Sequence, residues 1–516
     1  MSKQYRKPSK FSLKKCSTSR KKEPQTADEL IGFGIDFEES GDRWRNQDDP
    51  KSSRFYMKAI AAYKAALRVA PNSIEAAYNR ARLQLTIATN DHLFPPGVSY
   101  SAADMLQEAL RYHEYCLNLP DGHSEHDIIF NTGQTYIALA EEVSSGANGC
   151  SSAPFIRAME LVWNGIQMFD RALALQESQL QSMVPQDIDI DLDTEDGGVT
   201  LCDSDIFEGV ERAEADRPEQ SERWAVIKEP ITKSDVLDTV LAKLEALILL
   251  CGFIQQTGNT KLTGDPYIFH KEQGGYLLSK LEKLLENSPE SKAEAAITRA
   301  NFTVAVADLG FKSGNLSAQQ YTEYVQRAFP SGTTAELGPV MIVNKAEAYI
   351  QLAQTLLDRA NLNAAEVTWS QMFSHFTFAA KLLAEAATQD KMNARLCCLR
   401  GDVEMFRSRI ILRHEADPKR STTVKTLWDN AGVFYRGTRR LAEAYPDGQM
   451  GMKVEGIVKA IVVEMQKQLT REGGDATEIL ANARKELAAF PGWGEIAVEA
   501  VRNGVFDEMI LVELEK

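Results

Sequence analysis

Apolar residues recur at spacings of three and four along most of the chain, in segments separated by short stretches rich in Pro, Gly, Asn and Ser. This period places apolar side chains on one face of an α-helix. Val, Ile and Thr rarely alternate with polar residues, so β-strands are not expected. The pattern therefore predicts an all-α chain of amphipathic helices.

One helical segment occurs three times with the same skeleton, over residues 74–85, 127–138 and 340–351. Each copy has an Asn, a small residue two positions later, and an apolar residue three or four positions beyond it. The asparagines are Asn79, Asn131 and Asn344, and the small residues are Ala81, Gly133 and Ala346. A small side chain is needed where a second helix crosses close to the backbone, and large apolar neighbours fill the remaining contact. The copies therefore predict helical hairpins.

The first copy is preceded by the partner helices that such a hairpin requires. The residues that carry the arrangement there are Phe37, Gly41, Trp44, Ala59, Tyr63, Ala66 and the closing Pro71. This succession resembles the tetratricopeptide repeat (TPR) family, whose two-helix unit carries aromatic, small and closing Pro residues at set offsets. Later units keep parts of it at Tyr136, Phe169 and Ala172, at Ala346 and Tyr349, and around Gly401.

The resemblance implies a right-handed superhelical stack of helical hairpins, which is a TPR-like solenoid that becomes degenerate in its C-terminal half. Such a stack grows by addition, so a single elongated body of 516 residues is expected. The expected parts are a basic disordered tail over 1–28, TPR units over 29–178, an acidic disordered loop over 179–229, and degenerate TPR-like repeats with a terminal cap over 230–516.

Charge is distributed unevenly along the chain, whose formal net charge is −15. Residues 1–22 contain nine Lys or Arg and no acid, whereas residues 187–222 contain 14 acids and two arginines. Segments this charged do not bury enough apolar surface to offset the entropy of ordering. The basic segment fits an import signal, a nucleic-acid contact or a solvated tail without a role. The acidic segment fits a binding site for basic partners or a loop kept soluble by charge.

No pattern for catalysis, cofactor binding or metal binding is recognisable. No Gly-rich phosphate loop is present, and His123 and His126 lack a third metal ligand at a suitable spacing. The longest apolar run, residues 241–254, contains Lys243 and Glu245 and is shorter than the roughly 20 residues of a membrane span. Seven irregularly spaced cysteines indicate reduced thiols, and thus the nucleus and/or the cytoplasm. We therefore expect no enzyme, no cofactor, no metal site and no membrane partner.

The resemblance also bears on the ligand. In several TPR proteins a clamp of Lys, Asn and Arg on the first helices of three units holds the C-terminal carboxylate of a chaperone. Alignment through Gly41, Ala81 and Gly133 places acids at most of these positions, and only Asn79 agrees with the clamp. The resemblance therefore implies a groove for a positively charged ligand. Its expected residues are Glu38, Asp42, Glu75, Asn79, Asp127 and Asn131.

We therefore expect a non-enzymatic interaction scaffold, a chaperone or adaptor that binds a basic protein of the ribosomal-protein or histone type through an acidic groove and loop. The alternative is a structural adaptor subunit of a larger complex with an apolar peptide ligand. The salt dependence of binding distinguishes the two hypotheses. Binding of a basic partner should weaken as salt rises, because charge pairing is screened beyond about 10 Å at 0.1 M. The acidic body would repel a phosphate backbone, so nucleic acid is not expected to bind it and stays an alternative for residues 1–22 alone.

Overall fold

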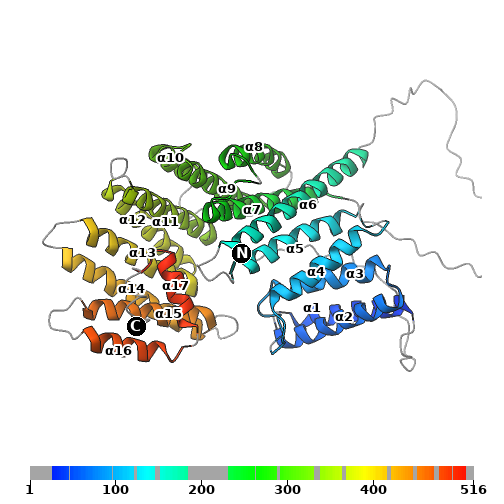
Figure 1. The fold of residues 1–516 in the computed structure, drawn as a ribbon, viewed down its shortest axis with the longest axis horizontal. Helices are drawn as coiled ribbons and strands as arrows, with labels where there is room; N and C mark the ends of the chain where they lie inside the picture. Colours follow the sequence, from blue (N-terminus) through cyan, green and yellow to red (C-terminus); the bar gives the residue numbers. More distant parts are fainter. Residues whose placement is uncertain are drawn as a thin grey trace, which may run out of the picture.

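The computed structural model confirms the all-α fold, since the residues that it describes form helices and no strands (Figure 1). It describes residues 26–506 except 46, 96, 121, 123–124, 146–151, 184–230, 262, 287–290, 331–337, 363–367, 415–419, 445–449, 470–475 and 491. The helices in this part of the chain are α1 (Ala27–Trp44), α2 (Asp49–Val69), α3 (Ile74–Ala88), α4 (Ala102–Leu117), α5 (His126–Ser145), α6 (Ala153–Met183), α7 (Lys233–Thr257), α8 (Pro266–Leu285), α9 (Lys292–Lys312), α10 (Ala318–Ala328), α11 (Pro339–Leu362), α12 (Trp369–Gln389), α13 (Ala394–His414), α14 (Arg420–Ala444), α15 (Met450–Leu469), α16 (Ala476–Leu487) and α17 (Trp493–Arg502).

The sequence determines where many helices begin. Thr26 accepts a hydrogen bond from the backbone of Glu29, whose side chain accepts one from the backbone of Thr26 in return. The same capping box starts α4, α7, α10 and α12. A capping box satisfies backbone N–H groups that have no partner within the helix, and it therefore fixes the first turn.

Two expected segment boundaries need correction. Helix α1 already begins at Ala27, and α6 continues to Met183, so helix extends into both segments that were expected to be disordered. Local capping explains the first case, because Thr26 is the residue that caps α1. Residues 1–25 and 184–230 lie outside the described residues, and their expected disorder stays a prediction.

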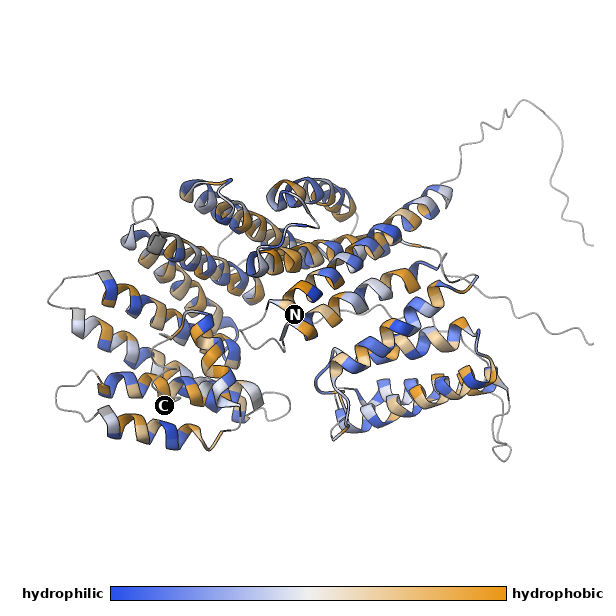
Figure 2. Ribbon diagram, in the orientation of Figure 1, coloured by the Kyte–Doolittle hydropathy of each residue, from blue (hydrophilic) through white to orange (hydrophobic). Residues whose placement is uncertain are grey.

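The helices stack in the order of the sequence, and most of them pack on the helices before and after them, whereas α9 packs most extensively on α7 and α17 packs on α15. The core has three large successive clusters of buried side chains, from α1 to α5, from α5 to α9 and from α9 onwards, and a small cluster of Ala77, Cys116 and Ile128. Helices α5 and α9 each contribute to two clusters. Helix α7 lies mid-stack, and Figure 2 shows it as a largely hydrophobic ribbon. The architecture is therefore a helical-repeat solenoid.

Small residues let these helices approach closely, as the hairpin prediction requires. A Cβ atom on Gly41 would lie 2.4 Å from Cε1 of Tyr56, and one on Gly133 would lie 2.7 Å from Cε1 of Phe169. The other residues expected in the packing are placed as follows: Ala59, Ala66, Ala81, Ala172, Ala346 and Tyr349 are buried, Tyr136 is half-buried, and Pro71 is exposed in the turn between α2 and α3.

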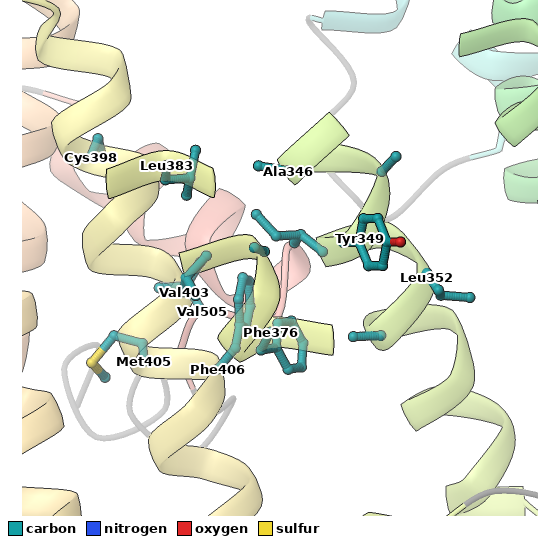
Figure 3. Packing of buried hydrophobic residues seen from close by; sticks show 14 of the residues in the cluster. Ala346, Tyr349, Leu352, Phe376, Leu383, Cys398, Val403, Met405, Phe406 and Val505 are labelled. Atoms are coloured by element: carbon teal, nitrogen blue, oxygen red, sulfur yellow. The ribbon is translucent and has the colours of Figure 1, made fainter. Parts of the chain in front are cut away.

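The C-terminal end of the stack folds back onto earlier helices. Gln354 of α11 donates a hydrogen bond of 2.8 Å to the carbonyl of Asn503, just beyond α17. In the core nearby, Val505 lies among side chains of α11, α12 and α13 (Figure 3). Phe376 and Phe406 stack there with ring centroids 5.1 Å apart. The segment after α17 therefore joins the core between α11 and α13, while α16 packs on α15.

Candidate functional site: an acidic inner groove

A groove with a cavity volume of about 1770 Å³ runs along the stack and is lined mainly by α5, α7, α9 and α11. We call it the inner groove. Each of these helices presents one stripe of residues spaced by three or four positions. On α7, for example, the stripe runs through Asp238, Leu241, Glu245, Ile248 and Gly252. This spacing puts the side chains on a single face of the helix.

The inner groove combines an apolar floor with a strongly acidic lining. Apolar contributions include Phe130, Leu241, Ile248, Ile297, Val304, Val340 and Met341. The lining has eight acidic side chains and two basic ones, Arg45 and Lys292. The acidic residues are Asp91, Glu141, Glu142, Asp238, Glu245, Glu294, Asp308 and Glu347. An excess of one sign between low-dielectric walls focuses the field and attracts ligands of the opposite charge.

Asp308 and Glu347 form contacts that hold them in the fold. Asp308 is 1% exposed and accepts hydrogen bonds from Tyr321, Lys312, Gln351 and Thr355, at 2.7 to 3.2 Å. It therefore ties α9 to α10 and α11. Glu347 forms an ion pair of 3.3 Å with Arg395 of α13. The remaining six acids, on α5, α7, α9 and the turn after α3, dominate the charge of the lining.

Three of these acids lie close enough to influence one another. Burial raises the pKa of Glu142 above its usual range, and the nearby carboxylates of Asp91 and Glu141 raise it further. Like charges at short range disfavour ionisation, so a bound cation would relieve this repulsion. This end of the inner groove is therefore suited to an ammonium or guanidinium group.

The thiol in the lining does not resemble a catalytic nucleophile. Cys251 is 1% exposed, and its burial raises the pKa of the thiol well above its usual value. The thiolate is the reactive form, so this side chain stays protonated at neutral pH. Cys251 therefore acts as a packing residue of α7.

The predicted groove residues on α1 lie elsewhere and are used in the fold. Glu38 pairs with Arg82 of α3 and also accepts a hydrogen bond of 3.2 Å from the hydroxyl of Tyr63. Asp42 accepts a hydrogen bond of 2.7 Å from the hydroxyl of Tyr56. Neither acid is part of the inner-groove lining. These two carboxylates hold α1 against α2 and α3.

The predicted residues on α3 and α5 are also outside the lining. Asn131 is 4% exposed and donates a hydrogen bond of 2.7 Å to the hydroxyl of Tyr78 on α3. Asp127 lies beside the ring of His126, whose Nε2 is 3.3 Å away. Glu75 is exposed in the first turn of α3, and Asn79 is half-buried. A role of these positions in ligand binding stays a prediction.

Sequence reasoning missed the acids that do line the inner groove. Of the three asparagines of the repeated segment, only Asn344 is in the lining, where it accepts a hydrogen bond of 3.0 Å from Asn301, and it is not among the expected groove residues. The sequence does contain a sign of two of these acids. Asp238 and Glu245 on α7 are seven residues apart and thus lie on the same face of the helix.

Comparison with known proteins gives no family assignment. No family model matches the sequence. The chain is 26% identical over 432 residues to the UPF0656 protein C926.02 of Schizosaccharomyces pombe, covering 82% of this chain and 86% of that protein. Among solved structures, the S. pombe nuclear import adaptor Nro1 covers 81% of this chain with all of its own, at 12% identity and a TM-score of 0.30.

A circular tandem repeat protein covers 95% of this chain with 93% of its own, at 13% identity and a TM-score of 0.28. Membership in the TPR family stays a prediction. None of the described helices combines the length and apolar character that crossing a bilayer requires.

Proposed function

We propose that this chain is a non-enzymatic scaffold that holds a cationic segment of a partner protein in the inner groove. The observation that carries the proposal is the charge of the lining, which has eight acids, with Asp308 and Glu347 among them tied into the fold, and two basic residues. Each exposed ion pair contributes only about 0–1 kcal/mol, so affinity would come from many weak contacts along the groove. The long-range field would mainly accelerate encounter with the partner.

The partner that fits this surface is a basic protein of the ribosomal-protein or histone type, and the role is that of a chaperone or adaptor. Residues 187–222, with 14 acids, would extend the same field after α6. Shielding clustered cations is what a chaperone for such proteins has to achieve, because exposed basic segments bind nucleic acids indiscriminately. We propose the nucleus and/or the cytoplasm as its location.

An adaptor for an apolar peptide is the second candidate, and the groove floor favours it. Val340 is 56% exposed at the start of α11, among other apolar lining residues. An apolar ligand would bind with little dependence on salt, whereas a cationic ligand would bind more weakly as salt rises.

A binding titration with a defined cationic probe tests the proposal. The probe is a labelled 20-residue Lys/Arg-rich peptide, titrated at about 50 and 300 mM salt, where the screening of exposed charges differs. The groove variant carries Glu141→Lys, Glu142→Lys and Glu245→Lys. The control variant carries the same number of reversals at exposed acids outside the lining, Glu272→Lys, Glu385→Lys and Glu486→Lys.

We expect the groove variant to lose at least about tenfold in affinity at low salt and the control to lose far less, because only the groove acids surround the ligand. At high salt the affinities of the groove variant and the control variant for the probe should differ less. Equal losses in both variants would mean that net charge alone attracts the probe. Unchanged affinity in the groove variant would refute the proposed site.

The location can be tested separately. If residues 1–22 act as an import signal, deleting residues 3–22 should move a tagged protein from nucleus to cytoplasm without changing its helical content. Cytoplasmic residence of the intact chain would contradict the import role.

A further inference from the structure

The inner groove has a candidate occupant within the same chain. Residues 1–22 contain nine Lys or Arg and no acid, and they precede α1 by only a few residues. We propose that these residues occupy the inner groove when no partner is bound, and that a partner must displace them. This inference rests on the proposed function, because it requires the groove to accept cationic segments.

The spacing of charges in the segment fits that of the lining. Lys3, Lys7, Lys10 and Lys14 follow one another at intervals of three or four residues, or roughly 10–14 Å in an extended chain. Asp238 and Glu245 are two turns apart on α7, or about 10 Å at 1.5 Å per residue. An extended stretch lying along the face of α7 could therefore pair successive lysines with these two acids.

Apolar side chains of the segment also have a counterpart. Tyr5, Phe11 and Leu13 lie between the cations. The floor of the groove contains Phe130 of α5 and Ile248 of α7. A ligand with both cations and apolar residues would use the acidic lining and the floor together, which a purely polar tail could not do.

The length of the segment is sufficient. Helix α1 is 18 residues long, which corresponds to about 27 Å, and Arg45 at its C-terminal end lines the groove. Twenty residues in extended form reach roughly 66–72 Å, so the segment can return along α1 and enter the groove. Tethering of this kind gives an effective concentration on the order of millimolar, which makes it a strong competitor of a free ligand.

The experiment compares the full chain with a full-length variant in which the nine Lys and Arg of residues 1–22 are replaced by Gln. The probe is a labelled synthetic peptide of residues 1–22, titrated against both proteins at low salt. A second variant deletes residues 2–22 and keeps Thr26, the cap of α1. A peptide of unrelated sequence with the same length and charge serves as a second probe.

We expect both variants to bind the 1–22 peptide at least about tenfold more tightly than the full chain does, because the tethered competitor is gone. Adding Glu141→Gln, Glu142→Gln and Glu245→Gln to the Gln variant should remove most of that gain. Zero-length crosslinking of the full chain should join lysines of residues 1–22 to these glutamates within one molecule, independently of protein concentration.

Several results would overturn the inference. Equal affinity of the full chain and the variants would mean that residues 1–22 do not occupy the groove, although the proposed function would stand. The inference would also fail, and the proposed function would stand, if the variants bound only the unrelated peptide or if crosslinks formed only between molecules. If neither probe binds any of the proteins, the inference and the proposed function fail together.

Discussion

Tyr435 of α14 donates a hydrogen bond of 2.7 Å to Oδ1 of Asp402 on α13. Tyr56 of α2 makes the same bond, also at 2.7 Å, to Asp42 of α1 near the other end of the stack. In each hairpin, a Cβ on the Gly that precedes the Asp would lie 2.4 Å from Cε1 of the Tyr ring. Gly-Asp on one helix and Tyr on the next thus form a contact that recurs in widely separated hairpins.

The two copies of this contact should differ in strength. Asp402 is buried and also accepts hydrogen bonds from Lys459, at 2.9 and 3.0 Å, whereas Asp42 is half-exposed. Tyr435→Phe removes a donor from a buried carboxylate and should lower the free energy of unfolding by about 1.5–3 kcal/mol. Tyr56→Phe should cost less, because water can reach Asp42. Urea unfolding of both variants checks this, and a larger loss in Tyr56→Phe would contradict it.

Neighbouring glycines on α8 allow a matched test of the close helix crossings. A Cβ on Gly274 would lie 2.2 Å from Cε1 of Phe302, whereas one on Gly275 would have no heavy atom within 4 Å. Gly274→Ala should therefore overpack the crossing and destabilise the protein by about 1–3 kcal/mol. Gly275→Ala should stabilise it by about 0.5–1 kcal/mol, because Ala restricts the unfolded chain. Melting temperatures that shift in the same direction would refute the crossing geometry.

His113 should make the stability of the protein depend on pH. Its side chain is buried, and burial, together with the charge of Arg82, lowers its pKa to about 3. Below pH 6.5 the unfolded chain binds a proton that the folded chain does not, so stability falls as the pH is lowered. Between pH 7.5 and 5 the loss should reach roughly 2 kcal/mol.

The variant His113→Leu should lose the share of this dependence that His113 causes and keep the share of His270 and His375, whose pKa values burial also lowers. His92→Gln, which changes an exposed histidine, should keep the share of His113. Melting temperatures of the three proteins from pH 7.5 to 5 provide the measurement. Parallel curves for the wild type and His113→Leu would show that His113 is accessible to protons in the folded protein.

Ionised Glu142 should lower the stability of the folded protein and strengthen the binding of a cationic ligand. Its pKa is raised by burial and by Asp91 and Glu141, so the folded state disfavours its ionised form. This penalty is present at neutral pH, where Glu142 is ionised, and disappears as the pH falls through its pKa. Glu142→Gln should therefore raise the melting temperature at pH 7 and not at pH 4, while weakening binding of the cationic probe. Glu385→Gln, at an exposed position of α12, is the control. A lower melting temperature at pH 7 would contradict the repulsion.

The sequence by itself determined the helices and their pairing into hairpins. Apolar spacing of three and four residues is a local property, and it marks helices wherever their neighbours lie. Small residues such as Gly41 and Gly133 are equally local signs, because a large side chain at a crossing would separate the two backbones. The same reasoning found the excess of acid, although the acids that it proposed for a ligand are not those that line the inner groove.

Only the tertiary structure decided which acids come together. Glu38 and Arg82 are 44 residues apart, and their pairing turned an expected ligand contact into part of the fold. Asp91, Glu142 and Glu294 meet along one groove although they belong to different hairpins. Which stripe of each helix faces the groove depends on the angles between successive hairpins. Those angles follow from the packing of the whole stack. The periodicity of the sequence shows only which residues share a face of a helix.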